Sequence, residues 1–185
     1  MAIIEVVVDG HPVLKKAAKR IRVVTDEICD LAENMIETMI KYNGVGLAAN
    51  QVGEAIRLIT VMHGEDDIRP YINPKIVKRS EELEYSDEGC LSFPLMFGTV
   101  GRSCSVEVHA QDLEMKKVKI EAEGFLARIF QHEIDHLNGI TFVERVEKDT
   151  LRKYTPQELE DEEDGEYEET ENESEESEDP GKKSY

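Results

Sequence analysis

The sequence predicts an α+β domain in which antiparallel or mixed β-sheets surround a central helix. Three observations predict this class: a long stretch with helical periodicity near the N-terminus, several strand-like apolar runs after it, and a second helical stretch that carries the motif H-E-x-x-H. A chain of 185 residues is the usual length of one domain. We place that domain at residues 1–155 and treat residues 156–185 as an acidic tail.

The first helix is expected from about Asp26 to Lys41. Thr25 precedes it as a candidate N-cap, and the acids that follow place negative charge in the first turn, where the helix dipole favours it. The apolar residues keep helical spacing and are expected in the core: Ile28, Leu31, Ala32, Met35, Ile36, Met39 and Ile40.

Strand-like runs, rich in β-branched and aromatic residues, come next along the chain. They cover residues 56–62, 71–78, 103–110 and 117–122. Asn73-Pro74 predicts a bend inside the second run, because this dipeptide favours a turn.

The second helix carries His132-Glu133-Ile134-Asp135-His136. Residues four apart on a helix differ by only about 40°, so His132 and His136 share a face and can take two adjacent corners of a tetrahedral metal ion. Glu133 is offset by about 100°, which suits a base acting on water rather than a ligand. The motif has three specified positions and also occurs by chance on surface helices. The apolar stretch before the motif favours a buried helix, and Gly139 after the motif favours an end of that helix just before this glycine.

A hydrolytic metal site of this type needs a third protein ligand. Phe142 stands where metzincin proteases have their third histidine, which excludes that class. A thermolysin-like glutamate would have to come from Glu144, Glu147 or the acidic tail, and none of these lies on an expected packed helix. Upstream, Cys90 lies within Glu88-Gly89-Cys90-Leu91-Ser92 and is the better candidate.

Three short motifs, in this order, resemble those of the peptide deformylases. They are G-V-G-L-A-A-N-Q at residues 44–51, E-G-C-L-S at residues 88–92 and Q-H-E-I-D-H at residues 131–136. The resemblance spans roughly residues 5–150 and implies the α+β fold of that family. These enzymes are metal hydrolases that remove the N-formyl group from the initiator methionine of nascent proteins.

The resemblance also implies the roles of individual residues. Cys90, His132 and His136 would bind Fe(II), although zinc, nickel or cobalt could occupy the same ligand set. Glu133 would carry the proton, and the side-chain amide of Gln51 and the backbone N–H of Leu91 would stabilise the oxyanion. The backbone at Gly46 would hydrogen-bond the substrate. The glycines of the first two motifs, Gly89 among them, would allow a peptide to approach the backbone closely.

Specificity is expected to come from an apolar pocket. Ile129 and Phe125 lie three and seven residues before His132, on the metal-facing side, and with Val45 they could accept a methionine side chain; ordinary core packing is the alternative. Arg128 could contact substrate, Glu88 or solvent. The apolar segment 93–97 could extend the substrate groove or cover the metal.

Composition limits the partners and the compartment. The tail from residue 156 holds 15 acids and two lysines, so it carries −13 of the net −19 and is predicted to be disordered. Such a tail opposes direct nucleic-acid binding, so we expect transient proximity to the ribosome and N-formylmethionyl nascent peptides as partners. No signal peptide or membrane-spanning run is expected, and three cysteines favour a reducing cytoplasm. Cys29 and Cys104 are interpreted as small buried apolar residues, with Cys104 in a strand.

Two other functions compete with deformylation of nascent proteins. One is a related enzyme that acts on another formyl or short acyl amide, and the other is a metal-binding protein without turnover. Glu133, Gln51 and Leu91 argue against the last, because a metal-holding protein needs neither a base nor oxyanion donors.

Overall fold

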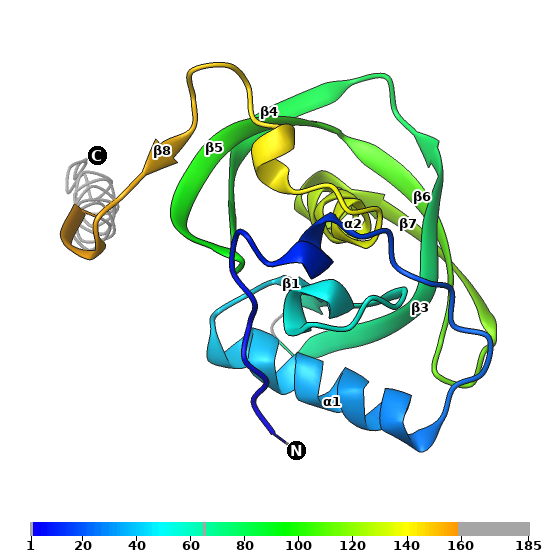
Figure 1. The fold of residues 1–185 in the computed structure, drawn as a ribbon. Coiled ribbons are helices and arrows are strands. Elements are labelled where there is room, and N and C mark those ends of the chain that lie inside the picture. Colours follow the sequence, from blue (N-terminus) through cyan, green and yellow to red (C-terminus); the bar gives the residue numbers. More distant parts are fainter. Residues whose placement is uncertain (1, 65, 159–185) are drawn as a thin grey trace, which may run out of the picture.

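The fold is built around α2, which is enclosed by strands on several sides (Figure 1). The computed structural model describes residues 2–64 and 66–158. The α+β class, with antiparallel sheets around the helix that carries the motif, is confirmed. No helix in the described part of the chain is long and apolar enough to cross a membrane.

Two sheets make up the β-structure, and all pairs of neighbouring strands in them are antiparallel. The larger sheet has the order β1-β2-β3-β6-β7 and the smaller one β4-β5-β8. The larger sheet consists of β1 (Gly46–Ala48), β2 (Leu58–Gly64), β3 (Asp67–Arg79), β6 (Ser105–Gln111) and β7 (Lys117–Glu123). The smaller sheet consists of β4 (Leu83–Cys90), β5 (Phe93–Ser103) and β8 (Arg152–Lys153).

The larger sheet separates the two α-helices, α1 (Asp26–Lys41) and α2 (Gly124–Leu137). Alternate residues of a strand point to opposite faces, so neighbours in the sequence enter different cores. Leu58 packs in the cluster that contains the buried residues of α1, whereas Ile59 packs in the cluster that contains those of α2. This explains why β2 reads as a continuous apolar run: both of its faces are covered.

The first helix has the bounds expected from its sequence, but its N-terminus differs in detail. Thr25 has the extended backbone of an N-cap, yet its side chain makes no capping hydrogen bond to the helix backbone. The hydroxyl of Thr25 interacts instead with the carboxylate of Glu27 and lowers the pKa of that group. The predicted N-cap position is therefore confirmed, whereas side-chain capping is not.

The second helix ends as predicted. Its last residue is Leu137, and Gly139 follows with φ +75°, the left-handed conformation typical of a helix stop. A Cβ at Gly139 would lie 2.7 Å from the backbone oxygen of Lys15, in the 3₁₀ turn η1 (Pro12–Lys15). A side chain at this position would thus push the N-terminal segment away from the end of α2.

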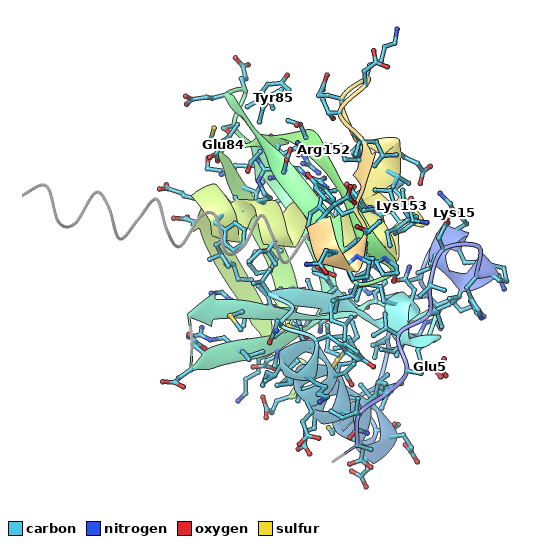
Figure 2. All side chains as sticks on the ribbon, turned by 90° about the vertical axis from the view of Figure 1, so that its left-hand side faces the viewer. Glu5, Lys15, Glu84, Tyr85, Arg152 and Lys153 are labelled. Atoms are coloured by element: carbon cyan, nitrogen blue, oxygen red, sulfur yellow. The ribbon has the colours of Figure 1, made fainter. Side chains whose placement is uncertain are left out.

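The four predicted strands are present with shifted ends, and the bend at Asn73-Pro74 is a bulge where the register of β3 against β6 changes. The pattern missed β1, β4, β5 and the short β8. Most of β4 is exposed and acidic, and Glu84 and Tyr85 lie at the surface (Figure 2). Pairing with β5, rather than apolar alternation, makes this segment a strand.

The expectations for Cys104 and Cys29 need correction. Cys104 lies in a bend between β5 and β6 rather than in a strand, and both Cys29 and Cys104 are half-buried. Residues 156–158 form a helical turn in which Thr155 and Glu158 hydrogen-bond reciprocally, and disorder of the tail stays a prediction. The rest of the predicted disordered tail lies outside the described residues.

Candidate active site

The two histidines of the motif lie side by side on α2. Their ring centroids are 5.0 Å apart, as expected for positions four residues apart on a helix. His136 and Glu133 are 1% and 4% exposed, so both polar side chains are withdrawn from water. Phe142 stacks beside the ring of His132 at a centroid distance of 6.2 Å. The residue that replaces the metzincin ligand is therefore a packing partner of the site.

Cys90 reaches the histidines from the end of β4. A register shift between Gly89 and Cys90 alters the path of the strand at this point. The Cys90 sulfur lies 3.2 Å from Nε2 of His136, and one nitrogen or sulfur atom from each of Cys90, His132 and His136 lies within 4.8 Å of the others. Three potential ligands from two distant segments thus converge on one point.

The donor set fits a divalent transition-metal ion. One thiolate with two imidazoles suits zinc and iron alike, and the spacing of the three atoms allows a single ion to contact all of them. Oε2 of Glu133 is buried and has no hydrogen-bond partner among the described residues. A buried carboxylate oxygen without a partner is costly, so this atom requires a ligand, water or proton at the site.

Glu88 orients the imidazole ring of His132 through a hydrogen bond. Its Oε2 lies 2.9 Å from Nδ1 of His132, and because a carboxylate only accepts, Nδ1 donates and Nε2 is left for a metal. Arg102 donates from Nε and Nη2 to the two carboxylate oxygens of Glu88, both at 2.9 Å. Burial alone would raise the pKa of Glu88, but the hydrogen bonds from Arg102 and His132 outweigh it and lower the pKa to about 2. Glu88 is accordingly held as a carboxylate.

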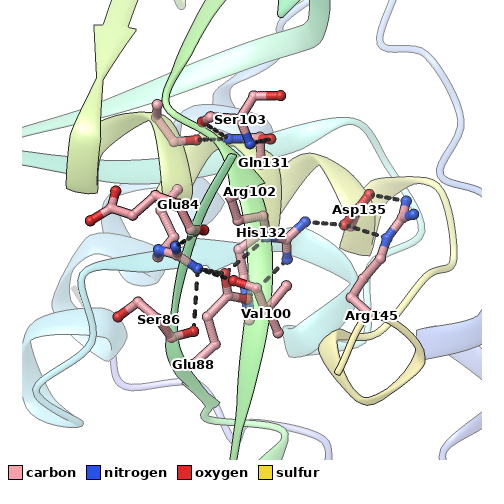
Figure 3. Close-up of polar contacts among 12 residues, drawn as sticks. Glu84, Ser86, Glu88, Val100, Arg102, Ser103, Gln131, His132, Asp135 and Arg145 are labelled. Atoms are coloured by element: carbon pink, nitrogen blue, oxygen red, sulfur yellow. Dashed lines mark hydrogen bonds and ion pairs between the residues drawn. The ribbon is translucent and has the colours of Figure 1, made fainter. Parts of the chain in front are cut away.

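The same network continues to the end of α2 (Figure 3). Nη1 of Arg102 donates to Oδ2 of Asp135 at 2.5 Å, and Arg145 donates to both oxygens of Asp135 at 3.0 and 3.2 Å. Buried charges are tolerated when each one has an opposite charge and hydrogen bonds. The Asp position of the motif is thereby explained, since Asp135 holds Arg102, which in turn holds Glu88.

Arg128 contacts Glu88 rather than solvent; of the alternatives that the sequence left open, contact with Glu88 is confirmed and exposure to solvent is wrong. It is 5% exposed, and its Nη1 donates to Oε1 of Glu88 and to the backbone oxygen of Val100, both at 2.9 Å. Its Nη2 donates to the backbone oxygen of Glu84 at 2.8 Å. One side chain of α2 therefore joins the helix to both β4 and β5.

Gln51 is fixed with its amide nitrogen toward Cys90. It lies in the 3₁₀ turn η2 (Ala49–Val52), and its Oε1 accepts from the backbone N–H of Ala48 at 2.8 Å. Nε2 is consequently directed to the Cys90 sulfur at 3.4 Å and to Oγ of Ser92 at 3.3 Å. The amide thus presents its donor side to the point where the potential ligands meet.

Glycines at two predicted positions allow close packing inside the site. A Cβ at Gly46 would lie 2.5 Å from Oε1 of Glu133, and a Cβ at Gly89 would lie 2.6 Å from the ring of Phe97. Burial raises the pKa of Glu133 to about 7. The backbone of β1 therefore covers a carboxyl group that can exchange a proton near neutral pH.

Comparison with known proteins gives one consistent result. The model of the family described as polypeptide deformylase matches residues 3–152. The chain belongs to this family. The peptide deformylase of Natranaerobius thermophilus is 47% identical over 148 residues, which cover 80% of this chain and 95% of that protein. Enzymes of the family are metal-dependent hydrolases that remove the N-formyl group from nascent peptides, and this chain is such a hydrolase.

Solved deformylase structures share the fold over the same part of the chain. The crystal structure of the enzyme from Thermotoga maritima matches with a TM-score of 0.76 at 41% identity, covering 78% of this chain and 98% of that one. A Met-Ala-Ser-bound structure of the enzyme from Acinetobacter baumannii matches with a TM-score of 0.74 at 37% identity, covering 78% and 98%.

A cavity of about 910 Å³ in this deformylase opens above the convergence point. All of the predicted site residues line it except His136, which lies beneath. Ile129 is buried, whereas Phe125 is 64% exposed and Val45 is 37% exposed, so these two lie at the rim. The apolar segment after Ser92 lines the cavity, and its first residue, Phe93, also packs on Phe142, with ring centroids 5.6 Å apart.

Several residues of the deformylase site had no signal in the sequence. Val6 and Val8 from the N-terminal segment line the cavity, and the backbone N–H of Val7 donates to the backbone oxygen of Gln51 at 2.8 Å. Arg102 and Asp135 were also missed as part of the site. Their spacing along the chain has no regularity, and only the docking of α2 against β5 brings them together.

Proposed function

We propose that this chain releases formate from peptides that begin with N-formylmethionine, with Fe(II) held by Cys90, His132 and His136. The observation that carries the proposal is the convergence of these three ligand atoms, within 4.8 Å of one another, below a cavity that Glu133 and Gln51 also line. Each of the following roles rests on that arrangement.

The metal would be held by Sγ of Cys90 and by one ring nitrogen from each histidine. When bound, the ion supplies a water molecule of lowered pKa as the nucleophile for hydrolysis. Zinc, nickel and cobalt suit the same donors, and iron is preferred here from the family resemblance. Glu88 supports this role for His132, because its hydrogen bond to Nδ1 fixes the ring and leaves Nε2 for the ion.

Glu133 would take a proton from the nucleophilic water and pass it to the departing amine. Its carboxyl group follows His132 directly on α2 and lies against Gly46 at the wall of the cavity. Burial raises its pKa to about 7, so the group can both accept and return a proton near neutral pH.

Gln51 and Leu91 would stabilise the negative charge that develops on the formyl oxygen. The amide of Gln51 is preorganised, because Ala48 fixes its oxygen and leaves the nitrogen pointing at Cys90. Leu91 directly follows Cys90 and lines the same cavity, which supports its backbone N–H as the second donor.

The peptide would add to β1 as an extended strand. β1 is the edge strand of the larger sheet, with β2 on one side, so Gly46 can offer backbone hydrogen bonds on the other. Gly89 lies across the cavity at the end of β4. The methionine side chain would enter between Val45, Phe125 and Ile129. The Met-Ala-Ser bound to the deformylase of Acinetobacter baumannii is a peptide of this class.

Nascent peptides in the cytoplasm, close to the ribosome, would be the natural substrates. This follows from the substrate class, because formylated N-termini arise during synthesis. We propose no direct contact with nucleic acid for the catalytic site, since the net charge of −19 disfavours it.

Anaerobic measurement of formate release from formyl-Met-Ala-Ser tests the proposal directly. Iron-loaded protein should release formate, and Glu133→Gln should retain the metal but lose activity by at least about a hundredfold. Acetyl-Met-Ala-Ser and formyl-Asp-Ala-Ser are matched controls for the acyl group and for the side-chain pocket. Absence of formate release from fully metallated protein would refute the function, and activity that survives in Glu133→Gln would refute the assigned base.

A further inference from the structure

The part of the active-site cavity wall that β5 supplies is held from outside by β8. This short strand lies at the edge of the smaller sheet and pairs with β5 at Met96 and Phe97 (Figure 1). The next residue, Tyr154, donates its backbone N–H to the backbone oxygen of Leu95 at 2.8 Å. Leu95, Met96 and Phe97 line the cavity, whereas Tyr154 and the residues of β8 do not. The C-terminal strand thus supports the cavity wall without entering the cavity.

The side chain of Tyr154 packs on the ring of Phe97. The two ring centroids are 5.7 Å apart and the ring planes meet at 80°, an edge-to-face arrangement that is favourable for two aromatic rings. The register places them together, because Phe97 is paired with Arg152 and residues two apart on a strand share a face. Both aromatic side chains are half-buried. Tyr154 is therefore a direct neighbour of a residue that lines the cavity.

The ring of Phe97 also reaches the backbone of β4. Phe97 is paired with Gly89, and a Cβ at Gly89 would lie only 2.6 Å from Cε1 of Phe97. The ring thus occupies the space that a side chain at Gly89 would take. Both residues line the cavity. The position of this one ring accordingly determines how much room the cavity has beside the backbone of Gly89.

Tyr154 is itself held on its other side by Arg152. The guanidinium carbon of Arg152 lies 5.8 Å from the centroid of the Tyr154 ring, within the range of a cation–π contact. Arg152 also forms an ion pair with Asp87, whose Oδ1 accepts from the hydroxyl of Thr99 at 2.7 Å. The register places Asp87, Phe97, Thr99 and Arg152 on the same face of the smaller sheet. Tyr154 is thus packed between Phe97 and a side chain that is fixed to β4.

We propose that Tyr154 is a positioning residue for the substrate: by fixing the ring of Phe97, it shapes the part of the cavity that receives the residues after formylmethionine. The inference rests on the proposed function, in which the peptide adds to β1 and passes Gly89 across the cavity. The wall beside Gly89 is apolar over residues 94–97. Apolar and aromatic side chains of the substrate would gain most there, because contact removes them from water.

The family match gives Tyr154 no role, since it covers residues 3–152. Steady-state kinetics of the full-length, iron-loaded protein on formyl-Met-Phe-Phe and formyl-Met-Ala-Ser tests the role proposed here. Tyr154→Ala should raise KM for formyl-Met-Phe-Phe about threefold to tenfold, with kcat and both constants for formyl-Met-Ala-Ser changed less than about twofold. Tyr154→Phe, which keeps the ring, should behave as the wild type.

Two further variants separate positioning from a general structural role. Leu151→Ala is the matched control, because it shortens a 45% exposed apolar side chain in the same segment, and it should leave both KM values unchanged. Phe97→Leu removes the ring through which Tyr154 acts, so adding Tyr154→Ala to this variant should raise KM no further. Additive effects of the two substitutions would overturn the proposal. An equal rise in KM for both peptides in Tyr154→Ala would overturn it as well.

Calorimetric titration with the product peptides Met-Phe-Phe and Met-Ala-Ser gives the same comparison without turnover. Tyr154→Ala should weaken binding of Met-Phe-Phe about threefold to tenfold and leave that of Met-Ala-Ser unchanged. Formate release from both substrates with no change of selectivity in Tyr154→Ala would refute the role of Tyr154 alone. Selective binding of Met-Phe-Phe that depends on Tyr154, without any formate release by metallated wild type, would refute the proposed function and leave the role of Tyr154 standing.

Discussion

Arg128 donates a hydrogen bond to Oε1 of Glu88 at 2.9 Å, while the other oxygen of that carboxylate accepts from His132. A side chain one turn before the motif thus supports the position of a proposed metal ligand through a single carboxylate. The guanidinium of Arg128 also holds backbone oxygens of β4 and β5. It therefore couples the helix, the smaller sheet and the site.

Replacing Arg128 should weaken both the fold and metal binding. Arg128→Met keeps the apolar stem but leaves buried acceptors without donors, which should cost about 1–3 kcal/mol of stability. Metal affinity should fall about tenfold to a hundredfold, as for other residues that orient a ligand. Chelator competition and thermal unfolding measure the two effects. Arg145→Met is the matched control, because this half-exposed arginine contacts Asp135 and not Glu88; equal metal loss in both variants would contradict the role.

Gly46→Ala should remove activity with little loss of structure. The added Cβ would lie 2.5 Å from Oε1 of Glu133, so the carboxylate or the β1 backbone has to move. A shift of about 1 Å in a catalytic group is sufficient for a hundredfold loss of rate. Gly64→Ala is the control, since a Cβ there meets nothing within 4 Å and Gly64 lies in the same sheet. Similar kcat values for Gly46→Ala and the wild type would be incompatible with this packing.

Gln51→Glu isolates the donor function of the amide. The variant keeps an oxygen for the backbone N–H of Ala48 but replaces the nitrogen that points at Cys90. Loss of one oxyanion donor should lower kcat by about a hundredfold to a thousandfold, with a much smaller change in KM. Metal content is measured in parallel, and an activity loss explained entirely by lost metal would argue for a role in ligand support instead.

Glu144 should make the protein more stable above about pH 4.5 than at pH 2. Hydrogen bonds from Lys15 and the backbone N–H of Thr141 lower the pKa of Glu144 to about 2, against an ordinary glutamate pKa of 4.5. A depressed folded-state pKa stabilises at pH values above the unfolded pKa, and this stability is lost as the pH falls through the folded pKa. Lys15 lies at the surface (Figure 2), so the ion pair should contribute less than about 1 kcal/mol.

Urea unfolding of Glu144→Gln between pH 7 and pH 2 checks this dependence. The difference in unfolding free energy from the wild type should stay constant down to about pH 5 and then decline toward pH 2. Glu54→Gln, at an exposed carboxylate with no recorded side-chain partner among the described residues, is the control. A difference that grows on acidification would reverse the assigned sign.

The sequence predicted the elements whose side chains repeat with a regular period. The apolar spacing of α1 defined that helix with its observed bounds, and the four-residue separation of His132 and His136 placed both on one face of α2. The predicted β-strands agree less well, because β4 and β5 lack the apolar alternation that would reveal them and depend on each other for pairing. Resemblance, rather than periodicity, was needed to select Cys90 from the three cysteines.

The sequence by itself determined the family, the motif helix and the kinds of side chain available for a metal. The tertiary structure alone decided which groups hold the site residues in place. Glu88 accepts a hydrogen bond from His132, and Arg102 and Arg128 donate to Glu88. Gln51 directs its side-chain nitrogen toward Cys90. The physical reason is that local periodicity fixes only the direction of side chains within one element. Arg128 and His132 reach Glu88, 40 and 44 positions away, only when α2 docks against the smaller sheet, and Arg102 reaches Glu88 only when β4 pairs with β5.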